Sequence, residues 1–318
     1  MKRSYLYFLG TLIFIGVLIF PHFVSNYIIH IAVLILIWSY VSTVWAYMGR
    51  FGLVSLGHGA FLGIGAYTSG LLFNNFHLTP LVGMFIGGIA AAIVALILGY
   101  ACFRFGVIGD YFALVTLALA EVIMLLIIAL REFTGGSLGF TLNKMGNSFL
   151  YLSSDSKIFF YYLALAFVIL SILIWKKIDK SKIYKAMRAI GEDELASASL
   201  GINVIKYKVI ITIISAFLTA LGGSLYGQYI TYLNPHTLSG VGVSLDIAFK
   251  AILGGMFNIW GPTVGTILIV TMEETFRGIF GSHFIGVSEV LYGIALICFI
   301  IFLPKGIYGT IVNKLSKK

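Results

Sequence analysis

The chain has 318 residues, of which 60% are apolar and only 10% are charged, and its mean hydropathy is +1.02. Soluble globular domains carry about 25% charged and about 45–50% apolar residues, so this composition excludes a water-soluble enzyme and indicates a polytopic membrane protein. The formal net charge of +9 would fit nucleic-acid binding in a soluble protein, but in a membrane protein it marks cytoplasmic loops. Cys102 and Cys298 lie in separate apolar runs, so no disulfide framework or metal site is expected.

Ten apolar runs predict about ten transmembrane helices, because about 20 apolar residues cross the hydrocarbon core. Eight or nine helices are the alternatives, since two of the runs are short and Gly-rich segments can be surrounded by protein. The expected fold is therefore an all-α polytopic integral membrane protein, with some helices short or broken, forming one domain over residues 1–318. The runs are at about 4–20, 27–47, 53–73, 81–103, 111–130, 158–175, 209–230, 243–257, 262–280 and 284–303.

The first run follows Lys2 and Arg3, as a signal peptide would. Pro21–Phe23 is not a small-residue cleavage site, however, and many spans follow, so the run is expected to stay as a first helix.

The third run begins in a stretch, residues 52–66, that contains more glycine than helix packing alone requires. Gly59 and Gly63 form one small-xxx-small step, and Gly57 and Gly65 are expected to loosen the helix. An unwound span would expose backbone groups near the cytoplasmic side, as substrate paths of transporters do.

The fourth run has a small residue at every fourth position: Gly83, Gly87, Ala91, Ala95 and Gly99. This spacing makes one smooth stripe along a helix, so a neighbouring backbone can approach closely.

Ionisable residues within apolar runs are costly and therefore informative. Glu121 lies 11 residues after Asp110, about 16 Å along a helix and so close to the membrane midplane. Asp246 and Lys250 are four residues apart and can neutralise each other. Such groups, like His58 among its glycines, either hold the bundle together or line a transport path. The candidate path residues are Ser55, His58, Gly59, Gly63, Glu121, Asp246 and Lys250.

Basic residues predict the orientation. With the N-terminus in the cytoplasm, 16 of the 21 Lys and Arg residues fall in cytoplasmic segments, four fall outside and Lys250 lies within a span. The positive-inside rule thus places both termini in the cytoplasm, and nucleic-acid binding is not needed to explain the charge.

Residues 176–208 are the largest predicted cytoplasmic segment, with eight basic and four acidic residues. Ile183, Met187 and Ile190 recur at helical spacing, which predicts a short amphipathic helix that Gly191 can end.

A second short helix should follow. Glu192, Asp193 and Glu194 place negative charge at its start, where the helix dipole favours it, and the helix is expected to run to about Leu200, with Gly201 as its C-cap. Two such helices are too small for a core of their own. They form either a solvated loop or a docking surface for a cytoplasmic partner.

No catalytic or metal-binding pattern stands out. Gly135–Gly139 matches G-x-S-x-G by letter, but a nucleophile elbow needs a preceding strand and a following helix, and here a loop between spans is expected. The chain has no Gly-Lys dipeptide and therefore no P-loop, and it has no H-E-x-x-H. We expect no cofactor in this chain, so that any ATP would be bound by another subunit.

Six blocks of the sequence resemble the LivM-type permeases of branched-chain amino-acid ABC importers. They occur in that family's order across residues 49–309, so the resemblance covers nearly the whole chain. Two features depart from it: Gly191 stands where a basic residue is expected, and Asp246 and Lys250 where a more apolar stretch is expected. The blocks are Ser55–Tyr67, Tyr111–Glu121, Thr134–Gly139, Ala186–Asn203, Leu253–Pro262 and Pro304–Gly309.

The resemblance implies a permease subunit that carries leucine, isoleucine and valine across the bacterial cytoplasmic (inner) membrane. It also implies a LivH-type homologue, two cytoplasmic ABC ATPases and an extracytoplasmic solute-binding protein as partners. Close relatives move urea or short amides, which is one alternative; an ion-coupled secondary transporter and a membrane-embedded enzyme are the others. The residues assigned to ATPase coupling are Arg188, Glu192, Asp193, Glu194, Leu200 and Gly201.

Overall fold

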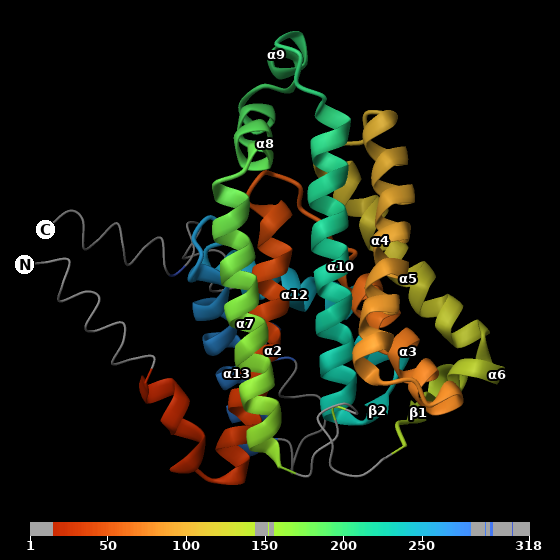
Figure 1. The fold of residues 1–318 in the computed structure, drawn as a ribbon, viewed down its shortest axis with the longest axis vertical. Coiled ribbons are helices and arrows are strands. Elements are labelled where there is room, and N and C mark those ends of the chain that lie inside the picture. The colour runs from red at the N-terminus through yellow and green to blue at the C-terminus, as the bar shows by residue number, and fades with distance from the viewer. Residues whose placement is uncertain are drawn as a thin grey trace, which may run out of the picture.

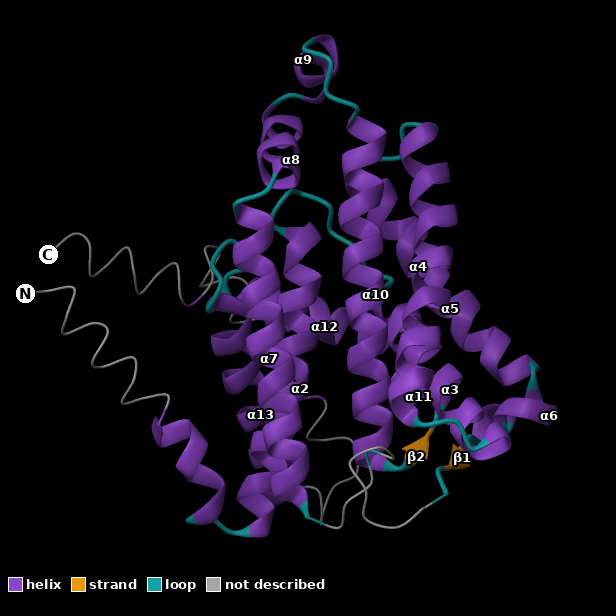
Figure 2. Cartoon of the chain, viewed as in Figure 1, coloured by secondary structure: helices purple, strands orange, loops and turns teal. Residues whose placement is uncertain are grey.

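The computed structural model describes residues 15–143, 152, 156–280, 290, 293, 294 and 307. It is a helical bundle with a small helical projection at one end and a two-stranded sheet at the other (Figures 1 and 2). The prediction of an all-α polytopic fold is confirmed. The elements are η1 (Phe20–His22), α2 (Asn26–Gly49), α3 (His58–Phe76), α4 (Pro80–Arg104), α5 (Gly109–Ala129), α6 (Arg131–Thr134), η2 (Gly136–Leu138), β1 (Phe140–Thr141), α7 (Lys157–Asp179), α8 (Lys182–Glu192), α9 (Glu194–Ser199), α10 (Val204–Ile230), β2 (Tyr232–Leu233), α11 (Pro235–Leu238), α12 (Val241–Gly254) and α13 (Gly261–Phe280).

Six helical stretches among the described residues are long and apolar enough to cross a membrane: α2, α4, α5, α7, α10 and the combined stretch Pro235–Gly254. The 19-residue α3 and the 20-residue α13 pack in the same bundle. Most of the tenth predicted span and most of the first lie outside the described residues, so ten spans stay a prediction.

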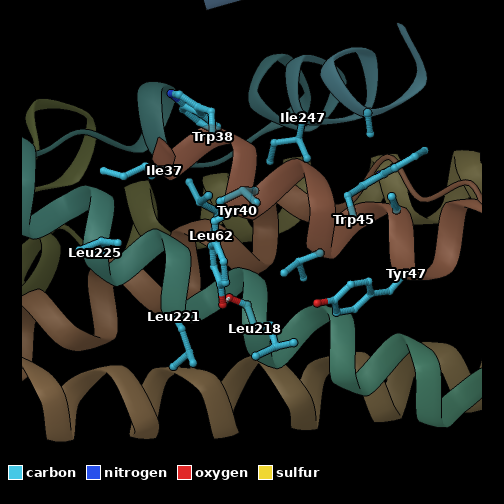
Figure 3. Packing of buried hydrophobic residues seen from close by; sticks show 14 of the residues in the cluster. Ile37, Trp38, Tyr40, Trp45, Tyr47, Leu62, Leu218, Leu221, Leu225 and Ile247 are labelled. Atoms are coloured by element: carbon cyan, nitrogen blue, oxygen red, sulfur yellow. Dashed lines mark hydrogen bonds between the residues drawn. The ribbon is translucent and has the colours of Figure 1, made fainter. Parts of the chain in front are cut away.

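Helix α2 runs through the middle of the core. All of its residues from Ile37 to Gly49 are buried, as expected for a helix that is apolar on every side. Tyr40 donates a hydrogen bond to the Leu218 carbonyl of α10 (2.8 Å), and Tyr47 donates one to the Ser171 carbonyl of α7 (2.5 Å). Figure 3 shows these aromatic rings among the apolar side chains of the core. Because no water reaches this part of the core, the two carbonyl oxygens supply the hydrogen-bond acceptors that the buried tyrosine hydroxyls need.

Helices α3, α4 and α10 meet backbone to backbone. A Cβ atom added at Gly65 would lie 2.0 Å from the Ala220 carbonyl oxygen, and one added at Gly223 would lie 2.0 Å from that of Leu62. Gly87 of the α4 stripe faces Gly65, so the stripe is a packing surface as predicted. Gly65 does not loosen α3, because its missing side chain is what admits α10.

Among the described residues, basic residues predicted to be cytoplasmic lie at one end of the bundle. Arg50, after α2, pairs with Asp179 at the end of α7 (2.7 Å), and Lys208 of α10 lies over Phe103 near the end of α4. Helices α8 and α9 project from this same end (Figure 1). Lys157 lies at the other end of α7, where it contacts the Asn26 carbonyl.

Candidate functional site

Helix α3 begins inside the bundle. His58, its first residue, hydrogen-bonds Ser215 of α10 through Nε2 and Oγ (2.8 Å). Ser215 lies 11 residues after Val204, the first residue of α10, or about 16 Å into the bundle. The predicted span 53–73 is thus wrong at its start, since residues 53–57 enter the bundle without helical structure.

The non-helical segment is hydrogen-bonded by side chains around it. The Trp45 indole donates to the Ser55 carbonyl (2.7 Å), the Leu56 amide donates to Thr116 Oγ1 (2.9 Å), and the Gly57 amide donates to Ser55 Oγ (3.2 Å). The expectation of exposed backbone groups is wrong for this conformation. The reason is that unpaired amide and carbonyl groups are costly where water is absent.

A chain of hydrogen bonds fixes His58, which is fully buried. Ser215 Oγ uses its one proton to donate to the Val44 carbonyl (2.9 Å), so it accepts a hydrogen bond from His58 Nε2–H. In the neutral ring Nδ1 then has no proton, so Ser55 Oγ donates to it (3.2 Å) while accepting from the Gly57 amide. This network assigns the neutral Nε2–H tautomer. The ring is therefore fully paired.

A second helix is interrupted opposite this point. Helices α11 and α12 are separated at Ser239 and Gly240, and Gly240 has a φ of +92°. The Gly59 amide donates to Ser244 Oγ (2.9 Å), which in turn donates to the Gly240 carbonyl (2.9 Å). A Cβ at Gly59 would lie 2.5 Å from the Gly240 carbonyl oxygen, and one at Gly63 would lie 2.7 Å from Ser239 Cβ. Gly59 and Gly63 thus hold the break in α11–α12 directly against α3.

Asp246 and Lys250 form an ion pair one to three turns after this break, as predicted. The Lys250 side chain is 1% exposed and that of Asp246 is 26% exposed. The Lys250 ammonium also lies 4.8 Å from the centre of a Trp38 ring, a distance that allows a cation–π interaction. The pair therefore places a buried positive charge beside α2.

Glu121 lies on the flank of α5 that faces the same break. Met124, one turn later on that flank, contacts Gly240. The Glu121 side chain is half-buried, and among the described residues no hydrogen bond or ion pair of Glu121 is found. The structure thus gathers the start of α3, the α11–α12 break and one face of α5, whereas Asp246 and Lys250 lie further along α12.

Sequence reasoning missed Thr116, Ser215, Ser239 and Ser244. Hydroxyl residues inside apolar runs are a general signal of helix–helix hydrogen bonds, but their spacing does not show which of them face residues 55–59. The Gly135–Gly139 motif forms a turn around η2, not a strand–turn–helix, so it is no nucleophile elbow.

The projecting helices largely follow the prediction. Helix α8 is amphipathic as expected, and Met187 and Ile190 are buried on its apolar face. The helix does not end at Gly191 but continues to Glu192. Asp193 then accepts a hydrogen bond from the Ala196 amide (2.9 Å) and caps α9.

Gly201 follows α9 with a φ of +84°, the left-handed conformation that glycine adopts without strain. Glu194 pairs with Lys208 at 2.5 Å and ties α9 to the start of α10. The Leu200 side chain is 83% exposed, and Arg188 and Glu192 are also exposed. The connecting segment is shorter than predicted, because α7 extends to Asp179 and α10 starts at Val204.

Comparison with known proteins identifies the family. A family model described as "Branched-chain amino acid transport system / permease component" matches residues 12–300. The permease protein LivM of Escherichia coli K12 is 29% identical over 282 residues, which cover 82% of this chain but only 64% of LivM. BraD of Pseudomonas aeruginosa is 34% identical over 134 residues, and the nucleoside permease NupC of Lactococcus lactis is 27% identical over 124; each match covers about two fifths of both chains. No solved structure matches significantly.

The family model covers most of the chain, and the described part contains helices able to cross a membrane. The protein is therefore a multi-pass membrane component of a transport system, and it belongs to the family of branched-chain amino acid transport system permease components.

Proposed function

We propose that this chain is the permease subunit of an ATP-binding-cassette importer for branched-chain amino acids in the bacterial inner membrane. The names of LivM and BraD support this substrate class. The structural observation that carries the proposal is the capped helix pair α8–α9, which projects from the basic end of the bundle (Figure 1). Such a rigid surface suits a subunit that must receive motion from another chain.

The partners proposed are a LivH-type homologue, two cytoplasmic ATPases and an extracytoplasmic solute-binding protein. ATP is bound by the ATPases, since this sequence has no Gly-Lys dipeptide. Leu195 and Leu200 are 81% and 83% exposed at the tip of the projection. Exposed apolar side chains beside charged ones are typical of a docking surface, here for an ATPase.

The proposed path opens where the start of α3 meets the break in α11–α12. Separation of these elements would free the backbone and hydroxyl groups that now pair with each other, and a polar substrate could then use them. Ser239 Oγ is already buried without a hydrogen bond among the described residues. The proposed path residues are Ser55, His58, Gly59, Gly63, Glu121, Asp246 and Lys250.

Both termini and residues 180–203 are proposed to be cytoplasmic, because the basic residues gather at this end. Single-cysteine labelling in protein lacking Cys102 and Cys298 tests the orientation. Labelling of a cysteine at Lys182 from outside intact cells would contradict it.

Uptake measurements test the function itself. The complex, expressed with the products of neighbouring genes, should take up leucine, isoleucine and valine into proteoliposomes when ATP is supplied, and an uncoupler should not stop it. Transport of urea or a short amide, without competition by leucine, would favour the alternative substrate class. Loss of uptake on uncoupling would indicate an ion-coupled transporter.

The coupling surface is tested by Gly201→Val and by charge reversal of residues 192–194. A β-branched residue at a left-handed position costs about 1–2 kcal/mol, so α9 should be displaced while membrane insertion persists. Each variant should co-purify less ATPase and uncouple hydrolysis from uptake. Gly201→Asn is the control, because asparagine tolerates this conformation. Full association and uptake in both test variants would remove α9 from the mechanism.

A further inference from the structure

A separate cavity of about 580 Å³ lies at the basic end of the bundle, between the ends of α2 and α7, the helix α8 and residues 256–257. Pockets for small molecules have volumes of about 300–1,000 Å³. Two of its lining residues, Arg188 and Glu192, also belong to the proposed coupling surface. Neither that surface nor the proposed path accounts for the buried Arg50 that lines the cavity.

Arg50 lines this cavity and is largely buried. Its side chain is only 6% exposed, and its Nη1 donates to Asp179 Oδ1 (2.7 Å). Its guanidinium carbon lies 4.1 Å from the centre of a Trp175 ring and 5.5 Å from that of Tyr184. Burial lowers the pKa of Arg50 and the Asp179 carboxylate opposes this shift, but an arginine stays protonated. The cavity therefore contains a buried, permanent cation.

Two of the three guanidinium nitrogens of Arg50 have no hydrogen-bond partner among the described residues. Arg50 Nε and Nη2 are buried and form no hydrogen bond with the described residues. Leaving buried donors unpaired is costly, and each such group calls for an explanation. Nε and Nη2 are the two donors on one edge of the guanidinium fork, and this edge matches a carboxylate in a bidentate manner.

The other lining residues balance the charge and add apolar surface. Arg188 and Glu192 line the cavity on α8, and Asp179 lies beside Arg50, so two cations face two carboxylates. A site for an inorganic anion would be expected to carry net positive charge, whereas a balanced site suits a zwitterion. Met187 and Met256 add apolar walls, and methionine adapts to side chains of varied shape.

We propose that this cavity binds a free α-amino acid with an apolar side chain, entering from the cytoplasm. Nε and Nη2 of Arg50 have almost no accessible surface, so the Arg50 side chain turns toward the cavity when the ligand carboxylate binds them. The ligand ammonium group binds the Asp179 and Glu192 carboxylates, and its side chain contacts the methionines. Arg188 at the mouth is exposed and can move aside. The choice of an amino acid, and the cytoplasmic side, rest on the proposed function.

The position of the cavity predicts an effect on transport. A ligand there would join the ends of α2 and α7 to α8, and it would stabilise the conformation that contains the cavity. Amino acid accumulated in the cytoplasm should therefore slow further import. The site would act as a product sensor within the permease.

Binding is tested with the assembled transporter in nanodiscs without solute-binding protein. The probes are L-leucine, leucinamide, which lacks the carboxylate, 4-methylpentanoate, which lacks the ammonium group, and inorganic phosphate. We expect leucine to bind, leucinamide and 4-methylpentanoate to bind at least tenfold more weakly, and phosphate not to compete. Competition by phosphate as strong as that by leucine would overturn the proposal in favour of a simple anion site.

Two variants assign the binding to this cavity. Arg50→Lys keeps the positive charge but removes the paired guanidinium N–H donors, and it should weaken leucine binding at least tenfold. Gly191→Leu should abolish binding by filling the space. Among the described residues outside its own helix turn, only the Phe51 carbonyl oxygen lies within 4 Å of a Cβ at Gly191, at 3.9 Å, so the fold should tolerate the change. Lys182→Leu, an exposed change on α8 outside the cavity, is the control. Unchanged binding in both test variants would place leucine elsewhere and overturn the proposal.

Sided uptake separates this proposal from the proposed function. Proteoliposomes preloaded with leucine should take up external leucine several-fold more slowly than empty ones, and Gly191→Leu should remove this inhibition. Normal leucine uptake with equal inhibition in wild type and Gly191→Leu would overturn the sensor and leave the importer standing. Import of another solute in place of leucine would refute the proposed branched-chain amino-acid importer. The nanodisc measurement of leucine binding would still test whether the cavity binds an amino acid.

Discussion

Helices α3, α4 and α10 approach one another through glycine and alanine, whereas α12 and α13 carry charged residues into the same bundle. At the first contact, Gly65 and Gly223 bring backbones together. At the second, Lys250 pairs with Asp246, and Arg277 of α13 pairs with Glu273 and Glu274 at 2.9 Å each.

Lys250 is 1% exposed, whereas Arg277 is 58% exposed, so the buried counterpart of the glycine contact is Lys250. These two places show different ways to keep polar groups away from water. Close backbone approach leaves no room for a ligand or for added atoms, so this contact should be sensitive to volume. The charged groups of an ion pair can exchange partners, but the stability of a buried pair depends on both charges being present. We therefore expect the glycine contact to act as a rigid body, and the charged side of the bundle to be the part that can change partners.

The largest effect is expected at the glycine contact. Gly65→Val would place its Cβ 2.0 Å from the Ala220 carbonyl oxygen, so α3 and α10 must separate, at a cost above the about 1–3 kcal/mol typical of overpacking. We expect little folded protein by size-exclusion chromatography. Gly242→Ala is the control, since nothing lies within 4 Å of its Cβ. A Gly65→Val protein that melts like wild type would show that the contact is not rigid.

The ion pair should respond to charge and not to volume. Asp246→Asn leaves Lys250, which is 1% exposed, without its carboxylate, and it should destabilise the protein by about 3–5 kcal/mol. Lys250→Met should cost less, because Asp246 is partly exposed and can be hydrated. The double variant should melt above Asp246→Asn alone. Additive effects in this thermal series would contradict a coupled pair.

The hydroxyl network around His58 should give a smaller effect. Ser215→Ala leaves the buried His58 Nε2–H without its acceptor, which costs about 1–3 kcal/mol. Thr219→Val is the matched control one turn later, because Thr219 Oγ1 is buried without a hydrogen bond among the described residues. Thermal stability should fall for the first and stay near wild type for the second. Equal losses would mean that the serine contributes packing only.

The smallest effect on stability is expected for Glu121→Gln, within about 0.5 kcal/mol, because no hydrogen bond or ion pair of Glu121 is found among the described residues. Uptake is the informative measurement: a role of the ionised group in the path predicts reduced uptake at a normal protein level. Wild-type uptake would exclude that role, and Glu121→Leu would then test whether a polar side chain is needed at all.

The sequence by itself determined the features that depend on neighbours along the chain. Composition predicted the membrane class, and the spacing of Met187 and Ile190 predicted the amphipathic α8. Acidic residues at the start of α9 and Gly201 just after its end followed from local backbone chemistry, whereas the side-chain cap by Asp193 was seen only in the structure. Asp246 and Lys250 pair because four residues make one helical turn.

Only the tertiary structure decided which distant segments meet. His58 lies 157 residues from Ser215, and Arg50 lies 129 residues from Asp179. No local pattern distinguishes a glycine that loosens a helix from one, such as Gly65, that admits a neighbouring backbone. The physical reason is that spacing along a helix shows which face a residue occupies, whereas the identity of the opposite surface depends on how all the helices pack together.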